Sequence, residues 1–490
     1  MARYLAGLFL LVAAAGLVYG LWPHEAQRPV TEEPGYRLTW QDCSFRMPED
    51  FRADCATLRT PDDDGAFALP VVVLRYEDED RRPQPLLYLQ GGPGASAGID
   101  SEQGLWSWYH FREFAGLKRD LVLMDRRGTG ASRPRFVCRD YERQGRQIMG
   151  QAVTAEAENR AALETLEHCL QHELVGFDPA RFGTRASARD VRALMALLQP
   201  DTQWHLLGVS YGTRLAIEVA RDVDNIASLV LDSVYPPGFG GISHWPELLA
   251  ESLAAFYQAC LSDTACNRLW QRNKGEFTSI EQAFSAALMR LKAEPLRFSL
   301  SDGQAPLEVV LTDTRLLSAV FMASYEQSQW HRALDAILAI NRGDRAAVQA
   351  LASSWLKRIF NPEVNSLAFL AVDCRDNSLG SEADYQAALA VTPWLAPHIG
   401  SLWDTSICQQ WPAQPLLLPS EPAAPTLLLG GTADPITPAS WAQWLQQAWP
   451  ASELVIYPEV GHSVLWSESC ALEQLETYLV DPTAGWPGCP

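Results

Sequence analysis

Short apolar runs alternate with segments of helical periodicity over the first half of the chain. Apolar residues recur at helical spacing in 186–199 and 211–223. The apolar runs lie at 67–76, 84–90, 119–130, 204–210 and 226–234, and the third ends in a glycine-rich turn. Strands that alternate with helices and are apolar throughout predict a parallel sheet covered by helices on both faces.

This alternation stops near Tyr235 and returns near Ala424. The pattern between them is mostly helical, with one short strand expected at 306–312. An apolar run within 424–438 and a strand at 452–458 then resume the earlier pattern. We therefore expect a sheet domain in two parts, 36–236 and 416–490, interrupted by a helical cap at 237–415.

The composition is that of a globular protein with a large core. Of 490 residues, 47% are hydrophobic and 20% are charged. The formal net charge is −20. Nucleic-acid phosphates bind basic surfaces, so this charge argues against a nucleic-acid partner.

The first 22 residues have the pattern of an export segment. Arg3 is followed by an uncharged run from Tyr4 to Trp22. A short basic start before an apolar core is typical of a signal peptide. The run is also long enough to span a bilayer if it is retained. Segment 1–22 is therefore a signal peptide, or an anchor that would tether the protein to a membrane.

Ten cysteines follow this leader, and none forms a CxxC pair. An even number of cysteines in an exported chain indicates disulfides rather than a zinc or redox motif. Sequence alone leaves the connectivity open, although the spacing favours successive neighbours. The candidate pairs are Cys43–Cys55, Cys138–Cys169, Cys260–Cys266, Cys374–Cys408 and Cys470–Cys489.

Residues 206–215 read LLGVSYGTRL, with Ser210 between two glycines. The segment ends an apolar run and begins a helical pattern. Gly-x-Ser-x-Gly at a strand-to-helix turn is typical of a nucleophile elbow, which exposes the serine hydroxyl at the top of a sheet. The motif also occurs by chance, so this interpretation depends on a base, an acid and an oxyanion site elsewhere.

A candidate acid and a candidate base follow at the ends of two later strands. Asp434 comes after the apolar run TLLLGG, and His462 lies in a Gly-His-Ser loop after the next strand. Serine, acid, histidine is the chain order that accompanies such an elbow. Asp232, at the end of the strand after the elbow, is the rival acid. Asp434 is favoured on chain order. Thr437 and Pro438 already suit the start of the next helix, which frees Asp434 for this role.

The oxyanion site would consist of two backbone N–H groups. One belongs to Tyr211, directly after the candidate nucleophile. The other is expected from Gly91 or Gly92 in the loop QGGPG, which follows the apolar run 84–90. Glycines there allow the backbone to approach a substrate oxygen closely.

Five segments together resemble the α/β-hydrolase peptidases of the proline iminopeptidase and tripeptidyl aminopeptidase type. They are YLQGGPGAS, LMDRRGTGASRP, GVSYGT, GGTADPITP and VGHSV. The leader, the cysteines and the segment AVDCRD are most similar to the secreted tripeptidyl aminopeptidase branch. The resemblance covers roughly 40–490 and is weakest from 240 to 360. Gln90 and Tyr211 depart from the His and Trp that are usual in the proline-specific enzymes.

This resemblance implies an α/β-hydrolase fold with a large helical cap and a Ser210–His462–Asp434 triad. It implies release of residues from the free N-terminus of peptide substrates, without a metal or other cofactor. We expect an exported enzyme of this kind, periplasmic or secreted. An esterase or lipase with the same triad is the first alternative, and a non-enzymatic envelope binding protein is the second.

Recognition of a chain end would need an acid beyond the triad. A protonated amine that enters a roofed pocket without a partner is costly, and Asp434 would already be engaged with His462. We therefore expect the cap to supply a carboxylate. The candidates are Glu326, Asp373 and Asp376, of which Asp376 and Glu326 are favoured.

Overall fold

A single mixed sheet forms the centre of the protein. The computed structural model describes residues 31–45, 51–61, 66–301, 305–377, 380–400, 406–409 and 411–489. Its sheet strands are β1 Thr31–Glu33, β2 Tyr36–Gln41, β3 Ala53–Arg59, β4 Ala68–Leu74, β5 Leu86–Leu89, β6 Leu121–Met124, β7 Trp204–Val209, β8 Ile226–Asp232, β11 Thr426–Gly431 and β12 Glu453–Tyr457. Their order across the sheet is β1-β2-β3-β4-β6-β5-β7-β8-β11-β12. Pairing is antiparallel from β1 as far as β6 and parallel from β6 to β12.

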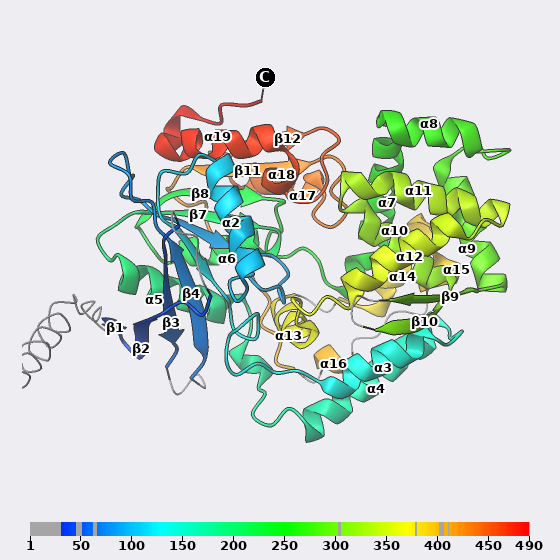
Figure 1. The fold of residues 1–490 in the computed structure, drawn as a ribbon, viewed down its shortest axis with the longest axis horizontal. Coiled ribbons are helices and arrows are strands. Elements are labelled where there is room, and N and C mark those ends of the chain that lie inside the picture. Colours follow the sequence, from blue (N-terminus) through cyan, green and yellow to red (C-terminus); the bar gives the residue numbers. More distant parts are fainter. Residues whose placement is uncertain are drawn as a thin grey trace, which may run out of the picture.

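Helices cover both faces of this sheet, on the left of Figure 1. They are α2 Glu102–Phe114, α5 Thr184–Leu198, α6 Tyr211–Ala220, α17 Ala439–Ala448, α18 Val464–Ser467 and α19 Ser469–Val480. Buried side chains of α5, α6 and α17 pack with one face of the strands, and those of α2, α18 and α19 pack with the other. Successive strand residues point to opposite faces, so Leu206 of β7 joins the first cluster and Leu207 joins the second.

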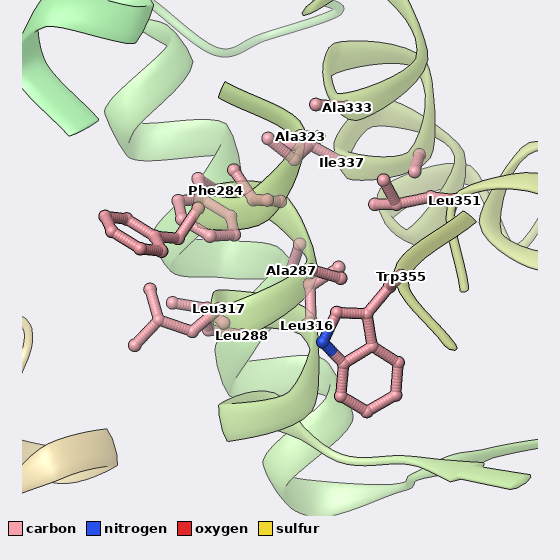
Figure 2. Close-up of a cluster of buried hydrophobic side chains, with 14 of the residues drawn as sticks. Phe284, Ala287, Leu288, Leu316, Leu317, Ala323, Ala333, Ile337, Leu351 and Trp355 are labelled. Atoms are coloured by element: carbon pink, nitrogen blue, oxygen red, sulfur yellow. The ribbon is translucent and has the colours of Figure 1, made fainter. Parts of the chain in front are cut away.

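A helical cap lies beside the sheet, on the right of Figure 1. It contains α7 Trp245–Ser262, α8 Thr264–Asn273, α9 Ile280–Ala293, α10 Asp313–Ser324, α11 Gln327–Arg342, α12 Ala346–Ile359, α14 Glu382–Val391, α15 Ala396–Ile399 and a hairpin of β9 Leu296–Ser301 with β10 Pro306–Leu311. The cap has its own apolar core, which Figure 2 shows around Phe284, Leu316 and Ile337. Because the cap has its own core, it can pack as a unit beside the sheet.

Two helices that precede the cap in sequence reach across to it. They are α3 Arg139–Met149 and α4 Ala155–His172. Buried Arg315 of α10 donates to the carbonyl oxygens of Ile148 at 2.8 Å and Met149 at 2.9 Å. It also pairs with Glu158 of α4 at 3.1 Å. These contacts fix α3 and α4 against the underside of the cap, where Figure 1 shows them.

One cap-segment helix packs with the sheet core instead. Helix α13, Ser366–Asp376, contributes Leu367 and Ala371 to the cluster on the α5 and α6 face. Figure 1 shows it between the sheet and the cap helices. The residues before it cross the loop after β5, because the N–H of Asn365 donates to Gly94 O at 2.9 Å. Helix α13 is therefore placed to line the space between the two parts of the protein.

Five disulfides join the ten cysteines, each to its neighbour along the chain. They are Cys43–Cys55, Cys138–Cys169, Cys260–Cys266, Cys374–Cys408 and Cys470–Cys489. Such a set is consistent with an oxidising compartment outside the cytosol. Segment 1–22, the expected signal peptide or anchor, lies outside the described residues. Among the helices that are described, none is long and apolar enough to cross a bilayer.

Candidate active site

Ser210 stands at a tight turn between β7 and α6. Its backbone has φ 58° and ψ −125°, in a region that costs a non-glycine residue about 1–3 kcal/mol. The flanking glycines make the turn possible. A Cβ at Gly212 would lie 1.8 Å from the carbonyl oxygen of Leu89, and one at Gly208 would lie 2.3 Å from that of Gly212. This is the strained geometry of a nucleophile elbow.

Asp434 and His462 are in direct contact at the ends of β11 and β12. His462 Nδ1 lies 2.9 Å from Asp434 Oδ2 and 3.0 Å from Oδ1. The same carboxylate accepts the N–H groups of Ile436 and Thr437, each at 3.0 Å, and the Thr437 hydroxyl at 2.8 Å. A carboxylate only accepts, so Nδ1 carries the proton and Nε2 keeps its lone pair.

Burial acts to raise the pKa of Asp434, but His462 and the hydrogen bonds from Thr437 and Ile436 outweigh it. The pKa is therefore held below its usual value, and Asp434 is ionised at neutral pH. An ionised, buried carboxylate fixes the orientation of the imidazole and stabilises its protonated form.

Asp232, the rival acid, has a different set of partners. Its carboxylate accepts the N–H groups of Val464 at 2.8 Å and Leu465 at 2.9 Å, at the start of α18. Burial raises the pKa of Asp232 to about 6, although these two hydrogen bonds act to lower it. Its carbonyl oxygen accepts the N–H of Ser210 at 2.9 Å. Asp232 therefore ties the elbow to the loop that carries His462.

The loop after β5 is held in place by Arg126, which no sequence pattern marked as a functional residue. The Nη2 of Arg126 donates to the carbonyl oxygens of Gln90 at 3.1 Å and Gly91 at 2.7 Å. In a trans peptide the C=O and N–H point in opposite directions. Fixing the Gly91 carbonyl on Arg126 therefore turns the N–H of Gly92 to the other side. Gly92 and Ser210 line the same cavity.

A cavity of about 430 Å³ lies above Ser210, between the sheet and the cap. Apolar and aromatic side chains form most of its walls, and Asp373 is the only carboxylate among the described residues that line it. Tyr235 and Trp441 form one wall as a stacked pair, with ring centroids 5.4 Å apart. The lining residues are Gly92, Pro93, Asn159, Ser210, Tyr235, Gly240, Gly241, Ile242, His244, Trp245, Leu248, Phe369, Asp373, Tyr385, Ile436, Thr437 and Trp441.

The family model described as alpha/beta hydrolase fold matches residues 84–469, which include Ser210, Asp434 and His462. The chain belongs to the alpha/beta hydrolase fold family. This assignment confirms the expected fold class and supports a hydrolase.

Similarity to individual proteins is weaker. A proline iminopeptidase from Aeromonas sobria is 30% identical over 154 residues, which are 31% of this chain and 28% of that relative. An esterase from Exiguobacterium antarcticum has a similar structure at 13% identity and a TM-score of 0.35, covering 85% of this chain and 97% of its own. A meta-cleavage product hydrolase from Pseudomonas fluorescens matches at 11% identity and a TM-score of 0.36, covering 85% and 95%.

The hydrolase places the three candidate cap acids in three different settings. Glu326 pairs with Arg358 at 2.7 Å on an exposed part of the cap and lines a separate cavity. Asp376 is 3% exposed and accepts the N–H and hydroxyl of Thr184, whose hydroxyl lies 2.7 Å from the Tyr211 hydroxyl. Only Asp373 lines the cavity with Ser210.

Two buried side chains support Asp373 and could not be recognised from the sequence. Asn377 Nδ2 donates to Asp373 Oδ1 at 2.6 Å. Arg214 Nη1, from the helix after the elbow, donates to Asn377 Oδ1 at 2.8 Å. Burial raises the pKa of Asp373, while Arg214 and Asn377 act to lower it. An arginine soon after the elbow serine in GVSYGTR is the only local signal for this arrangement.

The hydrolase also has a surface group that could hold a metal ion. Ligand atoms of Asp140, His168 and Glu173 lie within 4.8 Å of one another. Asp140 is already paired with Arg143, and none of the three lines the cavity above Ser210. Ser210 stands at a strained turn at the end of β7, and the His462 imidazole is held through Nδ1 by the Asp434 carboxylate.

Proposed function

We propose that this chain is an exported serine aminopeptidase that cleaves peptides from their free N-terminus. Ser210 would be the nucleophile, His462 the general base and then acid, and Asp434 the residue that orients His462. The observation that carries the peptidase assignment is the position of Asp373, the one carboxylate among the described residues around the cavity above Ser210. Five disulfides support an exported location.

In the first half of the reaction Ser210 Oγ attacks the scissile carbonyl carbon and His462 Nε2 takes the hydroxyl proton. That transfer needs Oγ and Nε2 within hydrogen-bond distance, a contact that commonly tightens only when substrate binds. The carbonyl oxygen becomes negatively charged and would accept the N–H groups of Tyr211 and of Gly91 or Gly92. One such donor is typically worth about 3–4 kcal/mol of transition-state stabilisation.

In the second half the tetrahedral intermediate collapses and His462 gives its proton to the leaving amine. The N-terminal fragment stays esterified to Ser210. Water, deprotonated by His462, then attacks the ester, and the released carboxylate leaves with Ser210 restored. Every proton passes through Nε2, because Nδ1 is held by Asp434.

Asp373 would pair with the protonated amine of the substrate. Asn377 donates to Oδ1 of Asp373, and Oδ2 accepts no hydrogen bond from the part of the chain that the structure describes. A buried ammonium without such a partner would be strongly disfavoured. The carboxylate therefore selects a free N-terminus over a blocked one.

The test compares a free-amine peptide amide, its N-acetylated counterpart and an ester with a neutral acyl group. We expect wild type to prefer the free peptide, and Asp373→Asn to raise its KM about 10- to 100-fold, the usual weight of a hydrogen bond to a charged group. Glu326→Gln is the matched control, because Glu326 pairs with Arg358 outside the cavity. Rapid ester hydrolysis by wild type, with cleavage of neither the free nor the acetylated peptide, would instead identify an esterase.

A further inference from the structure

A chain of buried hydrogen bonds connects the helix of the nucleophile to Asp373. Arg214 lies four residues after Ser210 on α6 and is 1% exposed. It reaches Asn377 at 2.8 Å, and Asn377 reaches Asp373 at 2.6 Å. The elbow and the candidate amine-binding carboxylate are thus joined by two side chains.

Arg214 is anchored so that it cannot follow Asn377 if that residue moves. Its Nη2 donates to the carbonyl oxygens of Pro236 at 3.0 Å and Phe239 at 2.7 Å. Its guanidinium lies 3.7 Å from the centroid of the Tyr235 ring. The planar fork of an arginine holds several acceptors in a fixed geometry. The direction of the bond to Asn377 is therefore set by the loop after β8.

Asn377 lies between the buried guanidinium of Arg214 and the half-buried carboxyl group of Asp373. Its amide accepts from Arg214 and donates to Asp373, so the two charges do not meet in a direct salt bridge. A direct bidentate pair would occupy both carboxylate oxygens. With the amide between them, Arg214 still favours the ionised form of Asp373 through space, while one oxygen remains for another partner.

We propose that Asn377 and Arg214 are positioning residues that set where Asp373 stands relative to Ser210. They determine the selectivity of the enzyme for a protonated N-terminus without touching the scissile bond. This inference rests on the proposed function, in which Asp373 reads the amine. The helix of the nucleophile thereby contributes to selectivity through Arg214.

The decisive variant is Asn377→Ala, which removes the link and leaves both charges. For a free-amine peptide we expect KM to rise about tenfold, with kcat within about twofold of wild type. For the N-acetylated peptide and the neutral ester, both constants should stay near wild type. Asn341→Ala is the matched control, since Asn341 makes comparable hydrogen bonds within the cap, to Ala283 O and Ile337 O.

A pH profile separates positioning from a general loss of structure. Asn377 donates to the ionised form of Asp373, so its removal raises the pKa of that carboxyl further. The acidic limb of kcat/KM should move to higher pH for the free-amine peptide alone. Arg214, Tyr235 and Asp376 interact electrostatically with Asp373, and His244 and Tyr385 line the same cavity. All of these groups are retained in the variant.

Two outcomes would overturn the inference. One is an Asn377→Ala enzyme with an unchanged KM and pH limb for the free peptide, and the other is equal losses on all three substrates. If Asn377→Ala does not fold, as judged by ester hydrolysis, Asn377→Gln replaces it, because the extra methylene displaces the amide while retaining its polarity. A wild-type enzyme with no preference for free amines would refute the proposed function itself. An effect of Asp373→Asn without one of Asn377→Ala refutes only the positioning role.

Discussion

Asp232 accepts the backbone N–H of Ser210 at 2.9 Å through its own carbonyl oxygen. Its side chain accepts the N–H groups of Val464 and Leu465, just beyond His462. One residue thus links the backbone of the nucleophile to the loop of the base. The Asp232 side chain therefore holds backbone groups in place, and the His462 imidazole is bound by Asp434.

The two aspartates should therefore differ when each is replaced by asparagine. We expect Asp434→Asn to lower kcat about 10⁴-fold, since the amide cannot fix the imidazole tautomer. Asp232→Asn keeps an acceptor oxygen and should retain activity within about tenfold, while losing about 1–3 kcal/mol of stability. Steady-state kinetics with urea unfolding would measure both. The reverse ranking of activities would make Asp232 the catalytic acid.

Ser210 and His462 should act as one unit. We expect Ser210→Ala and His462→Ala each to reduce kcat roughly 10⁶-fold, and the double variant to be no slower, because either loss disables the same step. A fluorophosphonate probe should label wild type and leave Ser210→Ala unlabelled. Circular dichroism would verify that each variant is folded. Additive losses in the double variant would contradict a shared step.

The last disulfide should stabilise the protein without serving catalysis. Cys470 and Cys489 are separated by 19 residues and tie the tail to α19. Replacing both with alanine should cost about 3 kcal/mol of unfolding free energy by the loop-entropy model. Cys260 and Cys266, only six residues apart, are the matched pair and should cost about 1 kcal/mol less. Denaturant unfolding would measure the loss of stability in each double variant, and steady-state kinetics would measure kcat. A large fall in kcat on removal of Cys470–Cys489 would contradict a purely stabilising role for this disulfide.

Asp376 should make stability depend on pH. Burial raises the pKa of Asp376 in the folded state to about 6, above its ordinary value of 3.8. Between these values the folded state holds more protons than the unfolded state, so this group reduces the free energy of unfolding as pH rises from 4 to 6. The full effect is up to about 3 kcal/mol. Asp376→Asn should flatten the slope of stability between pH 4.5 and about 6.5, and an unchanged slope would show that Asp376 titrates normally.

The elements of the core could be predicted because their signals are local. Gly208 and Gly212 are required by contacts within the turn itself, and Asp434 and His462 each follow an apolar strand. The same local signals predicted the fold class, which the match to the family model confirmed. The sequence could not predict which cap acid faces the cavity. Asp373 and Asp376 lie on the same helix, α13, and buried residues occur on most sides of that helix, so its pattern does not show which side faces the cavity. Arg126 and Arg214 were missed because their partners are carbonyl and amide groups far away in the sequence.

The cap leaves the sheet after β8 and returns at β11, and these two strands are direct neighbours, with Asp232 paired to Leu429. In evolutionary terms the part of the insert with its own core is a replaceable module, whereas α13 packs with the sheet. This part can grow, shrink or be exchanged without moving the strands that carry Ser210 and Asp434, since the two ends of the insert are anchored side by side. The residues that select the substrate can therefore change at a different rate from the residues that cleave the bond. A changed cap would still need a partner for Arg214 on the helix of the nucleophile.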